Sequence, residues 1–317
     1  MNKTQVVYIV FGFVVLLGLF IDLGLFSKKN VIVSTKKALL QTIFWVLIAL
    51  GFFVFIWFEK GNRIALEYLS AYLMEWSLSI DNIFVFIVIF TSFKVKEKYY
   101  GRVLLIGILT AIILRLAFIS IGLELVEQFH WILYIFGLFL LYTGYKVFYS
   151  THEEEFKPQE SIVYKFLNKF LPLTNEDGNG RFVIREKGKP LYTTLFVVVI
   201  LLGAIDFVFA LDSIPAVMGI SQHKLVIYTS NVFAVLGLRS LFFLLRSAVS
   251  KFDFLQQGIA FVLFFIGIKM LAEYWIDQWI DNDTQIILSL AVIIVCITGA
   301  VLYSIYHQKK GIPKDVK

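Results

Sequence analysis

The sequence is nearly without cysteine and poor in charge, and both shortages narrow what the chain can be. Cys296 is the only cysteine among 317 residues, so the chain can form neither an internal disulfide bond nor a thiolate metal cluster. Charged residues make up 16% of the chain, against about 25% in a typical soluble domain. A Gly-x-x-x-x-Gly-Lys-Ser/Thr loop is also absent, which argues against ATP hydrolysis by this chain.

Long apolar runs stand where the charge is missing. Hydrophobic residues make up 59% of the chain, and the mean hydropathy is +0.81. The runs are continuous and about 20 residues long, which is the length of a helix that crosses a hydrocarbon core of ~30 Å. A backbone in lipid must satisfy its own hydrogen bonds, so only helices or a closed barrel can span it, and continuous runs exclude the barrel. The sequence therefore predicts an all-α polytopic membrane bundle.

We expect nine spans in a single integral membrane domain that covers residues 1–317. Their approximate bounds are 6–26, 38–58, 65–92, 101–123, 131–149, 192–218, 225–245, 254–273 and 285–306. One long polar segment, 150–191, separates the fifth span from the sixth. Its Asp-Gly-Asn-Gly string at 177–180 lacks the later ligands of a calcium loop and is predicted to be a plain turn.

Lysine and arginine are distributed unevenly between the two ends of these spans. Most of the 29 lie on the side that holds segment 150–191, whereas the other side holds only Lys3, Lys60, Arg63 and Lys224. The positive-inside rule then places segment 150–191 and the C-terminus in the cytoplasm and the N-terminus outside. The net charge of +6 is thus sorted by membrane side, and we expect the lipid bilayer, but no nucleic acid, as a partner.

The chain contains two similar three-span units, 65–149 and 192–273, flanked by spans in 6–58 and 285–306. Each unit carries an Asp, an Arg and a Lys, spaced by 34 and 31 residues in the first unit and by 33 and 30 in the second. These residues are Asp81, Arg115 and Lys146 in the first unit and Asp206, Arg239 and Lys269 in the second. Since each unit crosses the membrane an odd number of times, consecutive units must enter from opposite sides. The sequence therefore predicts an inverted-topology repeat.

Four acidic residues lie inside the predicted spans: Glu75, Asp81, Asp206 and Asp212. A charged side chain at the middle of a bilayer costs about 2.5–3.5 kcal/mol or more, so these carboxylates need partners. One reading is static pairing with the four intramembrane bases, which are Arg115, Arg239, Lys146 and Lys269. The reading that we favour makes the acids a cation path and the bases its supports, because intramembrane acids are functional by default. Asp22, at the end of the first span, is expected to be an interface residue.

The acids are spaced in a way that leaves two geometries open. Glu75 and Asp81 lie six residues apart, as do Asp206 and Asp212, which is about 120° around a straight helix. Either the helices break, or the acids form successive stations along a path. Pro215 removes a helix hydrogen bond and frees carbonyls near Asp212, where broken helices can coordinate cations. The sequence leaves both geometries open.

All candidate ligands for the cation are oxygen atoms. Asn82, Ser213 and Asn231 add amide and hydroxyl oxygens to the carboxylates. Such ligands suit Mg²⁺, Mn²⁺ and Ca²⁺ rather than Zn²⁺ or Cu⁺. The ion is expected to be cargo rather than a permanently bound cofactor, and the chain is not expected to be an enzyme.

Two strings resemble the paired signatures of the TerC/Alx family. They are residues 75–82, Glu-Trp-Ser-Leu-Ser-Ile-Asp-Asn, and residues 206–216, Asp-Phe-Val-Phe-Ala-Leu-Asp-Ser-Ile-Pro-Ala. Shorter strings at 22–26, 131–137, 229–231, 236–239 and 267–271 extend the resemblance over most of the chain.

The resemblance implies a bacterial inner-membrane protein linked to tellurite resistance by name and to Mn²⁺ efflux by function. It also implies that Glu75, Asp81, Asp206 and Asp212 contact the metal. The chain departs from the family at Gly203, where a Glu is usual. We therefore expect weaker Mn²⁺ affinity or a shifted ion preference.

The leading hypothesis is a secondary transporter that exports Mn²⁺, with proton coupling as a further hypothesis. A second hypothesis is a membrane scaffold or assembly factor in metal or tellurite stress, with partners docked on segment 150–191 and no transport. A third is an intramembrane aspartyl hydrolase in which Asp81 and Asp206 share a proton. The sequence predicts no oligomeric state.

Overall fold

The computed structural model of the chain describes residues 3–22, 33–149, 158–186, 188–246 and 254–309. Within these ranges, eight helices are long and apolar enough to cross a membrane. They are α1 (Lys3–Ile21), α2 (Thr35–Lys60), α3 (Asn62–Ser92), α4 (Glu97–Gln128), α5 (Ile132–Tyr149), α7 (Thr194–Met218), α8 (Lys224–Leu245) and α11 (Asn282–Lys309). Helices α9 (Leu255–Leu271) and α10 (Glu273–Trp279) meet at 80° and together make a ninth candidate span. The predicted all-α polytopic membrane bundle is confirmed.

Tight reversals fix how successive helices enter the bundle. Between α2 and α3 the chain turns at Gly61, whose φ of 90° lies in the region that favours glycine. The Gly61 N–H donates to the carbonyl oxygen of Trp57 at 3.1 Å, which closes the end of α2. At the same end, the Lys60 ammonium donates to the Thr4 hydroxyl at 2.6 Å. The start of α1 and the α2–α3 turn therefore share one end of the bundle.

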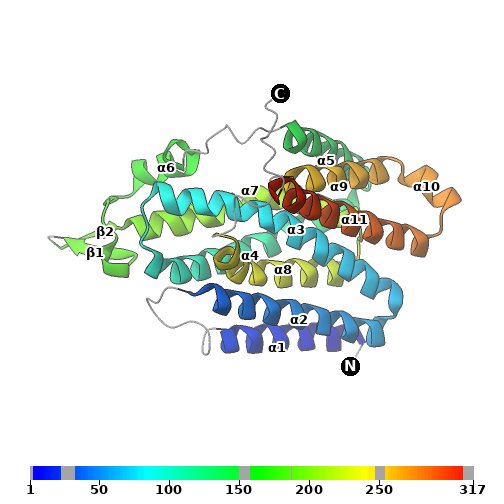
Figure 1. The fold of residues 1–317 in the computed structure, drawn as a ribbon, viewed down its shortest axis with the longest axis horizontal. Helices are drawn as coiled ribbons and strands as arrows, with labels where there is room; N and C mark the ends of the chain where they lie inside the picture. The colour runs from blue at the N-terminus through cyan, green and yellow to red at the C-terminus, as the bar shows by residue number, and fades with distance from the viewer. Residues whose placement is uncertain (1–2, 23–32, 150–157, 187, 247–253, 310–317) are drawn as a thin grey trace.

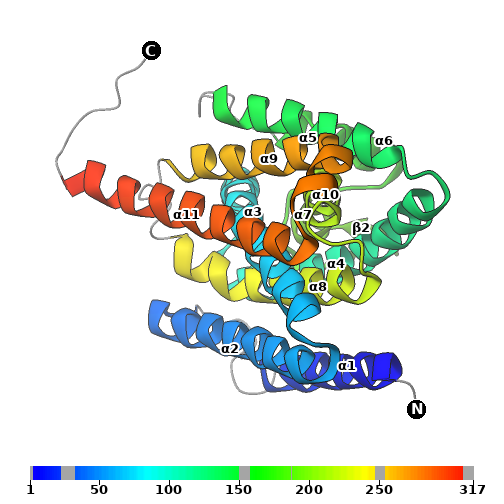
Figure 2. The same cartoon turned by 90° about the vertical axis from the view of Figure 1, so that its right-hand side faces the viewer.

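The helices are arranged in three groups (Figures 1 and 2). Helices α1 and α2 lie side by side on one flank, α5, α9 and α11 form the opposite flank, and α3, α4, α7 and α8 lie between them. The most enclosed helix is α8, of which 94% of the apolar window is buried. It packs against α2, α3 and α4. Polar side chains on α8 are thereby kept away from lipid. An intramembrane polar site has to lie in such an enclosed position, in the interior of the bundle.

The two repeat units contact one another in matching pairs. Helix α3 packs against α8, α4 against α7, and α5 against α9, so exchanging the units maps the contacts onto themselves. At the α5–α9 crossing, a Cβ on Gly267 would lie 2.9 Å from the Gly137 carbonyl oxygen, and a Cβ on Gly144 would lie 3.2 Å from that of Ala260. Gly144 and Gly267 occupy equivalent repeat positions, as do Gly137 and Ala260. This pairing is what a two-fold relation requires; the inverted membrane orientation of the units stays a prediction.

The polar segment between the units has structure of its own at one end of the bundle (Figure 1). It contains the short 3₁₀ helices η2 (Pro158–Glu160) and η3 (Gly178–Gly180), the helix α6 (Ile162–Phe170) and an antiparallel hairpin of β1 (Val183–Glu186) and β2 (Lys189–Tyr192). Residues 150–157 and 187 lie outside the described ranges.

The Asp-Gly-Asn-Gly string forms the plain turn that its sequence predicts. The carboxylate of Asp177 accepts a hydrogen bond from the backbone N–H of Asn179 at 3.0 Å. Gly178 and Gly180 adopt positive φ values of 54° and 88°, which glycine tolerates best. The Lys96 ammonium lies 2.6 Å from the Asp177 carboxylate, and its hydrogen bond lowers the pKa of Asp177. This carboxylate is thus engaged by a lysine.

Candidate functional site

Arg115 lies at the centre of a buried polar cluster. Its side chain is 2% exposed and projects from α4 toward α3 and α7. Its Nε donates to Asp206 Oδ2 at 2.7 Å and its Nη2 to Asp206 Oδ1 at 3.1 Å, so the guanidinium binds this carboxylate in a bidentate fork. Its Nη1 donates to Glu75 Oε2 at 2.8 Å. One guanidinium therefore joins two carboxylates from different repeat units.

Two neutral side chains complete the cluster. Asn231 on α8 donates from Nδ2 to Glu75 Oε1 at 2.5 Å and accepts from Arg115 Nη1 at 3.3 Å. The hydroxyl of Ser213 on α7 lies 3.4 Å from the same Nη1. Every member of the cluster is at most 2% exposed. With both acids ionised, the cluster has two negative charges against one positive charge, and it keeps them away from water.

The structure thus brings together five of the residues singled out in the sequence. They come from α3, α4, α7 and α8 and are Glu75, Arg115, Ser213, Asp206 and Asn231. Asn82 is buried further along α3, 4% exposed. Asp81 also lies on α3, but its side chain is outside the part of the chain that the structure describes.

Asp212 lies apart from this cluster. Its carboxylate accepts a hydrogen bond from the Thr143 hydroxyl on α5 at 3.1 Å, and the ammonium of Lys146 on the same helix interacts with it electrostatically. Asp206 and Asp212 therefore face different neighbours, α4 and α5. The six-residue spacing has this effect because it turns the second acid about a third of the way around the helix.

Neither α3 nor α7 breaks at its acids. Both run without interruption through the acidic strings, from Asn62 to Ser92 and from Thr194 to Met218. Pro215 lies inside α7, three residues before the helix ends, so the missing N–H affects only its last turns. A break at the acids is therefore absent from both helices. That the acids form successive stations along a path stays a prediction.

Arg239, the arginine of the second repeat unit, has a partner that the sequence does not predict. Arg239 Nη1 donates to Asp22 Oδ2 at 3.0 Å, and Gln41 Nε2 donates to Asp22 Oδ1 at 2.8 Å. Asp22 is 4% exposed, so the expectation that it is an interface residue is wrong. The sequence places Asp22 at the end of an apolar run, and only the packing of α1 and α2 against α8 encloses it.

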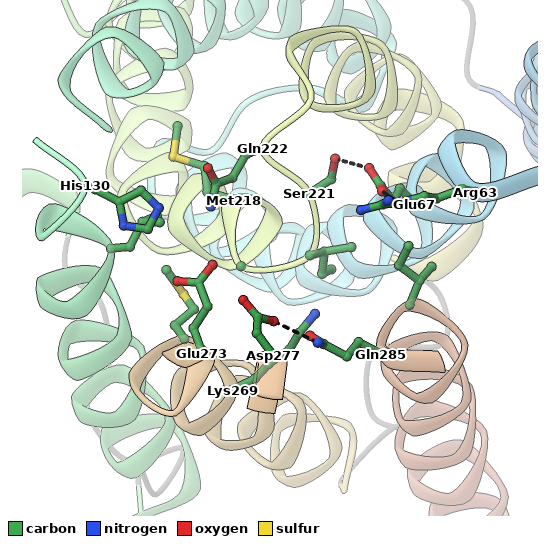
Figure 3. Close-up of a pocket in the computed structure, with 15 residues that line it drawn as sticks. Arg63, Glu67, His130, Met218, Ser221, Gln222, Lys269, Glu273, Asp277 and Gln285 are labelled. Atoms are coloured by element: carbon green, nitrogen blue, oxygen red, sulfur yellow. Dashed lines mark hydrogen bonds and ion pairs between the residues drawn. The ribbon is translucent and has the colours of Figure 1, made fainter. Parts of the chain in front are cut away.

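The second repeat lysine lines a cavity of about 370 Å³ at the end of the bundle where α2 turns into α3 (Figure 3). The Lys269 ammonium donates to the Ser289 hydroxyl at 3.3 Å and interacts electrostatically with Glu67, Glu273 and Asp277. Ser221 donates to Glu67 at 2.5 Å. These three acids lie near helix ends. The sequence does not single them out, because charged residues at the ends of spans are usually solvated.

The described side chains contain no ready-made cage for a metal. No group of three or more His, Cys, Asp or Glu side chains is placed to hold one ion in the described ranges, which leave out the Asp81 side chain. The donor set of the central cluster nevertheless fits a hard cation, since it presents carboxylate, amide and hydroxyl oxygens. The guanidinium of Arg115 occupies the space between them.

A model of the integral membrane protein TerC family matches residues 60–311. The chain belongs to the TerC family. The match spans both repeat units and α11, and begins near the end of α2. The resemblance found in the sequence is confirmed, and the chain is an integral, multi-pass membrane protein.

Several relatives cover most of the chain. Alx of Escherichia coli (strain K12), whose name describes a membrane-bound redox modulator, is 36% identical over 95% of this chain and 96% of its own length. An uncharacterised membrane protein of Rickettsia felis is 41% identical over 85% of this chain and 89% of its own. Another from Myxococcus xanthus is 42% identical over 82% of each chain. No solved structure matches the chain.

Proposed function

We propose that this TerC-family protein is a secondary transporter that exports a divalent cation, Mn²⁺ foremost, from the cytoplasm. The single observation that carries the proposal is the central cluster, in which Glu75 of one repeat unit and Asp206 of the other share a buried, oxygen-rich site. A bundle that encloses two carboxylates in its core does so at a cost. A role in moving cations accounts for that cost.

Further features of the fold support the proposal. Asp212 supplies a second acidic position on α7, and Asp81 adds a carboxylate to α3. The matching contacts of the two units suit the rocking of one unit against the other that alternating access needs. In the proposed orientation, within a bacterial inner membrane and with the N-terminus outside, the Lys269 cavity opens on the outer side and segment 150–191 faces the cytoplasm.

A second candidate, a scaffold without transport, is favoured by one specific observation. Arg115 pairs with both acids, as static stabilisation of the bundle would require. The redox role in the name of Alx finds less support in this chain, because a single cysteine cannot form an internal disulfide pair.

The test measures cell-associated Mn in a bacterium that lacks its own Mn²⁺ exporters and is loaded with Mn²⁺. The native chain, Asp206→Asn and Asp283→Asn are expressed at matched membrane levels. The Asp283 side chain is 64% exposed, so Asp283→Asn is the same chemical change outside the core. We expect the native chain and Asp283→Asn to lower cell Mn, and Asp206→Asn to lose this effect. If the native chain leaves cell Mn unchanged, the same assay with Ca²⁺ and Mg²⁺ decides whether another ion is carried.

Proton coupling is tested separately in proteoliposomes. We expect Mn²⁺ uptake into vesicles that contain the purified chain to follow an imposed pH gradient and to stop when an ionophore dissipates it. Transport that is indifferent to the gradient would remove proton coupling and leave cation transport intact.

A further inference from the structure

We propose that Arg115 is a resident counter-ion that competes with the transported cation for the oxygens of Glu75, Asp206 and Asn231. In this view, the guanidinium holds the site when the ion is absent and must be displaced before the ion can bind. The inference rests on the proposed function, because it assigns Arg115 a role in the handling of the cation.

The contacts of the guanidinium resemble those of a bound cation. Its three nitrogens contact five oxygens, which belong to two carboxylates, one amide and one hydroxyl. Hard divalent cations select the same kinds of oxygen. Since all these oxygens converge on Arg115, a cation that used both carboxylates would have to take the place of the guanidinium.

The charge of the cluster favours replacement of the guanidinium by a divalent cation over permanent pairing of Arg115 with the two acids. Asp206 receives two hydrogen bonds from Arg115, whereas Glu75 receives one from Arg115 and one from Asn231. The guanidinium therefore balances one of two negative charges, while a divalent cation could balance both. A resident positive charge also weakens cation binding, which a transport site needs because the ion must leave again.

The position of Arg115 ties this exchange to the arrangement of the two units. The arginine lies on α4 of the first unit and its bidentate partner on α7 of the second, and these helices pack together. If one unit rocks against the other, this contact is among those that must change. A purely structural arginine would instead be needed equally whether or not a cation is present.

The experiment measures Mn²⁺ binding to the purified full chain in lipid nanodiscs, with the electron paramagnetic resonance signal of free Mn²⁺ as the readout. We expect Arg115→Gln to lower the Kd for Mn²⁺ by about tenfold or more, a change that corresponds to about 1.4 kcal/mol. Arg246→Gln is the matched control, because Arg246 pairs with Glu97 at 3.1 Å near the end of α8, away from the cluster. Its Kd should equal that of the native chain.

Two more measurements separate competition from a structural role. The unfolding temperature of Arg115→Gln should rise more on addition of Mn²⁺ than that of the native chain, because the ion neutralises the two buried carboxylates that have lost their guanidinium partner. The double variant Arg115→Gln/Asp206→Asn should lose the gain in affinity. If Arg115→Gln folds only with Mn²⁺ present, the proposal is supported.

Three results would overturn it: Arg115→Gln binds Mn²⁺ no more tightly than the native chain, it fails to fold with or without Mn²⁺, or the double variant keeps the full gain. The outcome of the transport assay is independent of these binding results. Export by the native chain without a gain in Arg115→Gln would leave the proposed function standing and remove the inference. A gain in affinity without export would remove the proposed function and leave only competition between Arg115 and Mn²⁺ for these oxygens.

Discussion

At the residue scale, the central cluster depends on neutral side chains as much as on charged ones. The amide of Asn231 donates to one oxygen of Glu75 and accepts from Arg115. Without it, that oxygen would face a dry interior. A buried acceptor that loses its donor costs about 1–3 kcal/mol, and the cost is greater when the acceptor is charged.

Replacing Asn231 with leucine should therefore destabilise the protein by about 1–3 kcal/mol. The matched control is Thr91→Val, since the Thr91 hydroxyl bonds to the carbonyl of Ile87 at an exposed position; we expect a change within about 0.5 kcal/mol there. The free energy of unfolding in mixed micelles measures both. Equal small effects in the two variants would mean that the Asn231–Glu75 hydrogen bond contributes little.

Gly203 affects the site both by lacking a carboxylate and by leaving little room for a side chain. It precedes Asp206 by three residues on α7, so a side chain there would lie one turn from that acid. A Cβ at this position would lie 3.1 Å from the Cγ2 of Thr110 on α4. The Thr110 side chain would have to shift slightly to accept it. Because of this contact, adding the Glu that the family resemblance implies at this position is not a simple addition of charge.

The variant Gly203→Glu/Thr110→Ser should bind Mn²⁺ about tenfold more tightly than the native chain, since it adds a carboxylate and removes the obstructing methyl group. Gly203→Glu alone should gain less, and Thr110→Ser alone should gain nothing. Isothermal titration calorimetry with Mn²⁺ compares the Kd values of the native chain and the three variants. No gain in the double variant would show that position 203 does not contribute to the site.

At the element scale, the α5–α9 crossing depends on small residues. The Cβ that alanine would add at Gly267 meets the Gly137 carbonyl oxygen at 2.9 Å and Leu141 at 3.0 Å. In lipid, the hydrophobic effect does not drive helices together. Helices therefore often pack through small residues, which let their backbones approach closely.

Gly267→Ala should accordingly lower the unfolding temperature, even though alanine is favoured over glycine in a helix by about 1 kcal/mol. The same change at Gly51 of α2, where a Cβ meets nothing within 4 Å, should raise or preserve it. Thermal unfolding of the two variants side by side checks the sign. A higher unfolding temperature for Gly267→Ala would mean that α5 and α9 separate easily at this crossing.

Elements were easier to predict from the sequence than the contacts between them. Continuous apolar runs locate the long helices because the bilayer imposes their length. The 80° bend between α9 and α10 was missed, since hydropathy records no change of direction. Likewise, the offsets between Asp, Arg and Lys reveal a repeat, but only tertiary packing selects Asp206 for Arg115 and Asp22 for Arg239.

At the scale of the whole molecule, the two ends of the bundle differ in what they carry. One end holds α6 and the β1–β2 hairpin, and the other holds α10 and the Lys269 cavity (Figures 1 and 3). The positive-inside rule predicts that the first end is cytoplasmic. This prediction determines toward which end of the bundle the proposed export would move the ion.

Cysteine labelling in intact cells should reveal the orientation. Starting from Cys296→Ala, which has no cysteine, single variants Trp279→Cys and Lys189→Cys place a thiol at each end; Trp279 is 86% exposed on α10, and Lys189 is exposed on β2. We expect a membrane-impermeant maleimide to label Trp279→Cys in intact cells and Lys189→Cys only after permeabilisation, with no labelling of Cys296→Ala itself. The opposite pattern would invert the topology and place the Lys269 cavity in the cytoplasm. Export from the cytoplasm would then require the central cluster to release its ion toward the end that carries α6 and the hairpin.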